Sequence, residues 1–434
     1  MIAPVLLLAQ VYQDLFARAY GGRGDDWVYS IVACSDAGFA LAGYTRSLGS
    51  DGADFLLLKL SSLGDPEWAL TAGGQGSEYA NALVQTADGG FALAGYTRSF
   101  GAGGSDVLVI KFRQDGELEW ARAIGGTGNE SAYSIAQLPD GGLLLAGYTT
   151  SFGPGGSDIL LAELSEEGEL RWARSVGGPG SESANFLTLT NESGFFLAGY
   201  TQSASGTLPL VVCLDPSAEV LWAKSLLIGE RSYIRSAITC MDGYMLAGWA
   251  RGKGGDPDAL VLRLNEKGGL VWARAFGGKG YDWASSLSVL PGGCFGLAGC
   301  ISFGHYNFLV MGISAAGELE WAKTFGSPGW DAASCMAVSR DQKIAVAGYT
   351  SGFGIGGDDI LLVEMSPDGE YPGCVVDCPI RIRTPSVSSE KASLESKACF
   401  PVVSSPEVTV RKIPVSAVDV CAPPLQEPPP STDE

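Results

Sequence analysis

Apolar and polar residues alternate in short runs along the chain, and a unit near its middle shows the pattern well. Its first run ends at Asp140-Gly141-Gly142, whose glycines suit a tight hairpin turn. A second tight turn, Glu166-Glu167-Gly168, precedes the last run, and no run has a helical period. The unit is therefore predicted to form four short antiparallel strands. These are residues 132–138, 143–149, 158–164 and 169–175.

The same unit returns seven times between Tyr12 and Met365, marked by the glycine of a Leu-Ala-Gly motif (Val-Ala-Gly in the last copy). Gaps between successive marker glycines are 52, 52, 52, 49, 51 and 49 residues. Periods in this range indicate a solenoid, a propeller or an array, and four antiparallel strands make one propeller blade. We predict an all-β, seven-bladed β-propeller over residues 12–373. The marker glycines are Gly43, Gly95, Gly147, Gly199, Gly248, Gly299 and Gly348.

The two ends of this repeat region complement each other. After Met365 the last unit has Gly373 where other units carry tryptophan, and Pro372 disfavours strand pairing there. The N-terminal segment DLFARAYGG, residues 14–22, aligns with EWARAIGG of another unit and places Phe16 at the tryptophan position. We therefore expect residues 12–20 to supply the outermost strand of the seventh blade and to close the ring.

A tryptophan recurs on the outermost strand of six units. A large flat side chain repeated once per blade favours packing between blades, burying about 150–250 Å² each time. We expect its ring to lie against the glycine-bearing strand of the next blade, with the marker glycine leaving the space. The alternative is an aromatic sugar-binding platform. The set, with Phe16 in the seventh place, is Trp68, Trp120, Trp172, Trp222, Trp272 and Trp321.

The repeated motif W-x-x-x-x-GG, then DGG, then AGYT-x-S resembles that of the prokaryotic surface β-propeller repeat proteins. The resemblance covers residues 12–373. It implies a scaffold outside the cell or in the cell envelope, often with an unknown ligand, rather than an enzyme.

The composition and net charge of the chain exclude some classes of binding partner. The 434 residues are 46% hydrophobic and 18% charged, with a net charge of −20. Such an acidic chain repels nucleic acid and anionic membrane surfaces, and no apolar run reaches the roughly 18 residues of a membrane helix. Residues 1–11 are either the end of a signal peptide or a lead-in to the first strand.

Catalytic motifs are scarce, so we expect neither an enzyme nor a bound cofactor. His305 is the only histidine, without the neighbouring ligands of a zinc site. A pair of carboxylates suffices for glycoside chemistry, which keeps a glycan hydrolase or lyase open as an alternative.

Six acidic residues recur ten positions after the tryptophan or Phe16, at the loop that enters the innermost strand. Two interpretations remain open: a ring of carboxylates that binds Ca²⁺ or another cation, or carboxylates that accept backbone hydrogen bonds from their own glycine-rich loops. The residues are Asp26, Glu78, Glu130, Glu182, Asp282 and Asp331.

The repeat is irregular at blades four to six. The long loops, such as residues 125–130 and 150–158, should share one side, which we call the loop face, and ligands are expected there. Irregular loops on this face predict an apolar and basic patch for a protein partner or an acidic polysaccharide; drift of the repeat is the alternative. The patch residues are Leu227, Ile228, Arg231, Trp249, Arg251, Lys253 and His305.

Residues 374–434 form a tail rich in Cys, Pro and Ser, expected to be irregular and partly disordered. Cys374, Cys378, Cys399 and Cys421 allow three pairings that would staple the tail outside the cell. Residues 408–415 are one predicted strand, seeking an edge on the ring or on another subunit. The leading function is a secreted or envelope scaffold that binds a protein or carbohydrate on its loop face. The alternatives are a structural subunit that self-associates through its tail, and the glycan-active enzyme.

Overall fold

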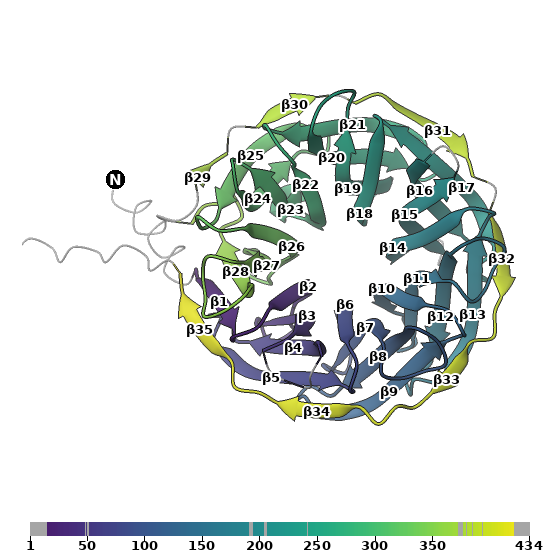
Figure 1. Ribbon diagram of the computed structural model, residues 1–434. Helices are drawn as coiled ribbons and strands as arrows, with labels where there is room; N and C mark the ends of the chain where they lie inside the picture. The colour runs from purple at the N-terminus through teal and green to yellow at the C-terminus, as the bar shows by residue number, and fades with distance from the viewer. Residues whose placement is uncertain are drawn as a thin grey trace, which may run out of the picture.

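Seven five-stranded antiparallel sheets surround a central opening in the computed structural model (Figure 1). The structure describes residues 15–47, 49, 52–190, 194–203, 206–240, 242–371, 376–378, 380–383, 385–392 and 394–420. The prediction of an all-β, seven-bladed propeller is confirmed, and in these ranges the one helical element is a short 3-10 turn at Pro291–Gly293. No helix among these residues is long and apolar enough to span a membrane.

Six blades follow the chain, each with four strands that run outward from the centre. The first three blades are β2 (Asp26–Ala33), β3 (Phe39–Thr45), β4 (Asp54–Leu60), β5 (Pro66–Gly73); β6 (Glu78–Gln85), β7 (Phe91–Thr97), β8 (Asp106–Phe112), β9 (Leu118–Gly125); and β10 (Glu130–Gln137), β11 (Leu143–Thr149), β12 (Asp158–Leu164), β13 (Leu170–Gly177). The next three are β14 (Ser181–Leu189), β15 (Phe195–Ser203), β16 (Gly206–Leu214), β17 (Val220–Ile228); β18 (Arg231–Cys240), β19 (Gly243–Arg251), β20 (Pro257–Asn265), β21 (Leu270–Gly277); and β22 (Trp283–Val289), β23 (Phe295–Ser302), β24 (Tyr306–Ile313), β25 (Leu319–Phe325).

The seventh blade joins the two ends of the repeat region. Its inner strands are β26 (Asp331–Val338), β27 (Ile344–Thr350) and β28 (Asp359–Met365), and its fourth strand is β1 (Ala17–Gly21) from the N-terminus. Ala17 pairs with Val363 in an antiparallel ladder. The predicted ring closure is confirmed for the described part of this segment; residues 1–14, including the 1–11 lead-in or signal remnant, lie outside the described residues.

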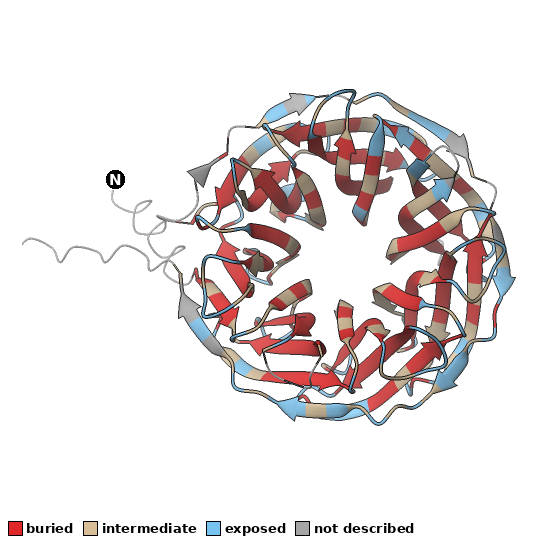
Figure 2. Ribbon diagram, viewed as in Figure 1, coloured by how far each residue is buried: buried red, intermediate tan, exposed pale blue. Residues whose placement is uncertain are grey.

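The hydrophobic core lies between the blades. In β4 and β8, every residue is buried, because both faces of a blade pack against neighbours. Leu57 of the first blade, for example, belongs to the same cluster as Leu93 and Ile110 of the second. Buried residues dominate within the blades, whereas the innermost strands carry intermediate and exposed positions where they border the opening (Figure 2).

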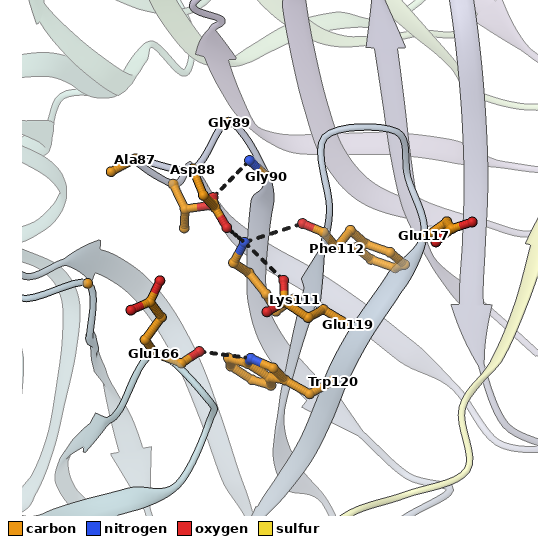
Figure 3. A network of polar contacts seen from close by, with 12 residues as sticks. Ala87, Asp88, Gly89, Gly90, Lys111, Phe112, Glu117, Glu119, Trp120 and Glu166 are labelled. Atoms are coloured by element: carbon orange, nitrogen blue, oxygen red, sulfur yellow. Dashed lines mark hydrogen bonds and ion pairs between the residues drawn. The ribbon is translucent and has the colours of Figure 1, made fainter.

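The outermost tryptophans Trp120, Trp222, Trp272 and Trp321 reach the next blade at a different glycine from the one we expected. The indole of Trp120 donates from Nε1 to the carbonyl oxygen of Glu166, 3.0 Å away (Figure 3). A Cβ on Gly168, in the turn between the third and fourth strands, would lie 2.7 Å from the indole ring. Gly168 has φ 78°, so this glycine serves both the turn and the packing. Trp222, Trp272 and Trp321 face Gly268, Gly317 and Gly369 in the same way.

The marker glycines serve the innermost strand instead. A Cβ on Gly43 would lie 1.8 Å from the carbonyl oxygen of Trp27 in the neighbouring strand β2. At this point β2 contains a β-bulge, an extra residue that pushes its backbone toward the glycine. The same close approach occurs at Gly95 and Gly147. The expectation that these glycines make room for the tryptophan rings is thus corrected.

The tail adds a fifth strand to every blade. We call the described residues between 376 and 420 the belt, because they run around the outside of the ring in the direction opposite to the blades (Figure 1). From the sixth blade down to the first and then to the seventh, its strands are β29 (Val376–Asp377), β30 (Arg381–Arg383), β31 (Val387–Lys391), β32 (Glu395–Ala398), β33 (Val402–Ser404), β34 (Thr409–Lys412) and β35 (Ser416–Asp419). The strand predicted within residues 408–415 is β34, paired with β5 of its own ring.

The belt repeats every seven residues, one repeat per blade. Backbone N–H groups of Cys378, Ala392, Cys399, Ile413 and Val420 each donate to the carbonyl of the alanine that follows the outermost aromatic residue. Those positions are separated by seven or fourteen residues. Cys378 and Cys399 are buried free thiols on the sixth and third blades, so they form no staple with each other. Cys374 and Cys421 lie outside the described residues.

Candidate ligand-binding channel

A cavity of about 750 Å³ occupies the centre of the ring. This volume lies within the range of about 300–1,000 Å³ that is typical of small-molecule sites. Most of the residues that line the cavity belong to the innermost strands, at the ends nearest to the loop face. Two more, Trp249 and Tyr349, come from the second strands of their blades. The lining residues are Trp27, Tyr29, Asn81, Tyr133, Asn185, Tyr233, Arg235, Trp249, Trp283, Ser285, Ala332, Ala333, Ser334 and Tyr349.

One residue per blade reaches the cavity from the bulge of the innermost strand. Each of these strands has its register shift at the same place, three positions after the acidic residue or its replacement. A bulge turns the side chain of its extra residue away from the regular ladder. We call these seven residues the bulge ring. They are Tyr29, Asn81, Tyr133, Asn185, Arg235, Ser285 and Ser334.

The bulge ring is large on one side and small on the other. Blades one to four contribute Tyr or Asn, and the amide of Asn185 donates to the carbonyl of Ile234 on the next blade at 2.9 Å. Asn81 makes the equivalent bond to Ala132 at 2.8 Å. Blades six and seven contribute only Ser285 and Ser334. The free volume of the channel is therefore expected beside these two serines.

Aromatic rings cover much of the remaining wall. Trp27 and Tyr349 stack with ring centroids 4.1 Å apart and planes 10° from parallel. Trp249 pairs in register with Tyr233 across β18 and β19. Burial raises the pKa of Tyr349 to about 12, so its hydroxyl stays a neutral hydrogen-bond donor at physiological pH.

Arg235 is the one charged side chain among the described residues of this wall. It is exposed to the channel space, yet the surrounding ring removes enough water to lower its pKa. Its guanidinium lies 5.7 Å from the centroid of Trp283, in cation–π contact. Among the described residues, no carboxylate forms an ion pair with it.

The six predicted acidic residues are buried, one per blade, around the loop face. Each accepts the backbone N–H four positions before it at 2.6 to 2.8 Å, for example Glu130 from Gly126. Glu130 also accepts the hydroxyl of Thr149 at 2.8 Å. This geometry is that of the loop-bonding interpretation. Across the described ranges, no group of three or more His, Cys, Asp or Glu residues could hold a metal ion, and a shared cation ring stays a prediction. The six are Asp26, Glu78, Glu130, Glu182, Asp282 and Asp331.

The predicted patch at blades four to six is divided by the fold. Trp249 lines the channel, whereas Leu227 pairs with Ser388 of the belt at the outer rim. Ile228 is buried in the core between blades four and five, so it offers no surface to a ligand. These three members therefore lie in different environments.

The basic members of the patch lie on the loop face. Arg231 and Arg251 are opposite each other on β18 and β19, and Arg251 donates to the carbonyl of Gly255 at 3.0 Å. Lys253 is exposed in the loop that follows, and His305 is half-buried on the sixth blade. Ser232, rather than Arg231, occupies the register position of the acidic residues in this blade. A ligand role for these side chains stays a prediction.

Sequence reasoning missed the bulge ring, Arg235 included. A signal was present: around this position the units keep their alternation, while the third residue after the acid changes from Tyr to Asn, Arg and Ser. A position that varies from unit to unit, inside an otherwise regular repeat, is one that packing between the blades does not fix. Only the register of the β-ladders shows that the residues at this position face the channel.

Comparison with known proteins gives limited similarity, and no protein-family model matches the chain. The regulatory protein FlaEY of Caulobacter vibrioides is 29% identical over 159 residues, which are 33% of this chain and 16% of that protein. The chain thus matches about a sixth of that relative's length.

Three solved structures align with this chain at TM-scores below 0.5. The WD40 domain of Neurospora crassa Pan2 has a TM-score of 0.49 at 10% identity, covering 79% of this chain and 89% of that one. A puromycin hydrolase has a TM-score of 0.48 at 15% identity, covering 84% of this chain and 53% of that one. A glucose dehydrogenase has a TM-score of 0.39 at 11% identity, covering 65% and 95% respectively.

Proposed function

We propose that this protein is a non-catalytic binding protein that takes a carbohydrate ligand into the central channel from the loop face. The observation that carries the proposal is the aromatic-lined cavity of about 750 Å³. Flat rings such as Trp249 and Tyr349 offer apolar faces for stacking, and their polar atoms add hydrogen bonds. A propeller holds such rings on rigid strands, as precise recognition requires. A setting outside the cell or in the envelope belongs to the proposal and has its support in the repeat resemblance.

The chemistry of the wall favours binding over catalysis. The described lining residues include no Asp, Glu, His or Cys. A glycan hydrolase or lyase of the kind considered above needs a pair of carboxylates at the bond it cleaves, and would have to use another site. A protein partner is the main alternative ligand, and it would bind to the loops around the channel mouth.

A panel of neutral, acidic and sulfated oligosaccharides, titrated against intrinsic tryptophan fluorescence, tests the proposal. Trp249→Ala and Tyr349→Ala should each weaken binding of the best ligand about tenfold, since each removes about 1.4 kcal/mol of stacking and burial. Trp330→Ala is the matched control, because Trp330 is 60% exposed and is not among the lining residues. Failure of every saccharide to bind, or an equal effect of all three substitutions, would reject the channel as a carbohydrate site. Release of reducing ends would instead support the enzyme.

A further inference from the structure

We infer that the channel ligand carries a carboxylate that binds Arg235, and that it is a small saccharide containing uronic acid. This inference rests on the proposed function and deepens it by naming the ligand class. It begins from a charge without a partner: Arg235 faces the channel, and no described carboxylate pairs with it. The protein has a net charge of −20, so its acidic residues outnumber its basic ones. Even so, none of the described acidic residues forms an ion pair with Arg235.

A guanidinium enclosed in this way favours an anion. The side chains of the channel wall surround the guanidinium, remove part of its hydration and lower its pKa, so an incoming carboxylate meets a reduced desolvation cost. Arginine presents parallel N–H donors that match the two oxygens of a carboxylate in a bidentate pair. Trp283 holds the guanidinium from one side at 5.7 Å to the ring centroid.

The space for a ligand lies next to this cation. On the two blades that follow Arg235 around the ring, the bulge residues are Ser285 and Ser334, the smallest of the set. Their neighbours Ala332 and Ala333 are also small. A pyranose ring placed there would have Arg235 at one edge and the stacked pair Trp27 and Tyr349 at the other.

The charge count favours a carboxylate over more highly charged groups. The described wall has one cation and no Lys or His, which balances one carboxylate but not a phosphate monoester with about two charges. The cavity has the volume of a small-molecule site, and its aromatic walls suit the apolar face of a sugar. A short oligosaccharide with a single uronic acid residue combines these features. An acidic peptide is the competing class that the experiment must separate.

The experiment compares matched ligands by isothermal titration calorimetry on the full chain. The probes are an aldobiouronic acid, which is a disaccharide with a single carboxylate, its methyl ester, and a short oligoglutamate peptide. The acid should bind, and esterification should weaken binding roughly 30-fold or more, as expected for removing one partner of an enclosed charge pair. Arg235→Gln should cause a similar loss for the acid but little further loss for the ester. Arg235→Lys should retain part of the affinity, because it keeps the charge and loses the bidentate geometry.

Arg113→Gln is the control, since Arg113 is exposed and pairs with Glu117 outside the channel. It should leave all affinities unchanged, and equal melting temperatures should show that each variant folds. Equal binding of acid and ester with no effect of Arg235→Gln would overturn the inference while leaving the proposed function intact. Absence of binding by both sugars would overturn both. Binding of oligoglutamate through Arg235, without binding of either sugar, would replace the saccharide with a peptide.

Discussion

The ring and the belt both build blades from repeats, but at very different scales. A ring repeat spans about 50 residues and supplies four strands, whereas a belt repeat spans seven and supplies one. In the ring, β4 and β8 are buried along their whole length. In the belt, Val402 of β33 remains 56% exposed, because only one side of that strand meets the ring. The comparison shows that the ring strands form the core of each blade, whereas the belt strand covers its outer edge.

The outermost strands explain why the belt matters. A strand at the edge of a sheet presents unpaired N–H and C=O groups that invite pairing with other chains. The belt fills this edge on all seven blades. The belt strands depend on the ring in turn, because strands of two to five residues are too short to be stable by themselves.

The largest expected effect comes from removing the belt. Deleting residues 376–434 exposes seven strand edges and the inter-blade surfaces covered by Cys378, Cys399 and Val420. We expect self-association together with a lower melting temperature, since each apolar side chain that becomes exposed loses about 1.5–3 kcal/mol. Light scattering coupled to size exclusion, with calorimetry, measures both. A truncated ring that stays monomeric and melts at the original temperature would show that the belt contributes nothing to edge protection.

A pair of neighbouring substitutions tests the seven-residue repeat within the belt. Cys399 is 7% exposed and lies in the core between blades two and three, whereas Phe400 is 87% exposed. Cys399→Asp should destabilise the protein by roughly 2–7 kcal/mol, because it places an unpaired polar group in an apolar site. Phe400→Asp should change the stability by less than about 0.5 kcal/mol. Urea unfolding compares the two variants, and equal losses would contradict the assigned facing of the belt.

The smallest expected effect concerns a ring carboxylate next to the belt. Burial and the nearby charge of Glu182 raise the pKa of Asp158 to about 6, while Lys397 of the belt opposes the shift. A raised folded-state pKa means that the folded protein binds the proton more tightly, so this group's stability contribution falls as pH rises from about 4 to about 6. The free energy of unfolding of Asp158→Asn should therefore exceed that of the original protein by up to about 3 kcal/mol at pH 7. Near pH 3.5 the two proteins should be equally stable.

Urea titrations at several pH values measure that difference. Lys397→Gln should enlarge the fall in stability between pH 4 and 7, because it removes a positive charge that favours the ionised Asp158. A gain for Asp158→Asn that is the same at every pH would contradict a titration at this position.

Much of the ring could be predicted because its information is local. Tight turns such as Asp140-Gly141-Gly142, and runs of the right length, predicted β11 and β12 with the bounds that the structure shows. The repetition of the pattern gave the number of blades, and Phe16 gave the closure. Of the belt, only the strand within residues 408–415 was predicted, because the other belt strands are too short for alternation to stand out. Its period of seven, from Cys378 to Val420, becomes meaningful only when each step is matched to a blade.

The sequence by itself therefore determined the strand pattern, the seven units and the joining of the ends, because turn chemistry and hydrophobic alternation act over a few residues. Tertiary structure decided which side chains contact each other and which of them face the channel. Trp120 packs on a turn glycine, Gly43 accommodates a bulge, and Arg235 reaches the channel. Each of these depends on the register of one strand against another, where a shift of one residue moves a side chain to the opposite face. Residues some 50 positions apart set that register through packing, so no short segment of the sequence contains it.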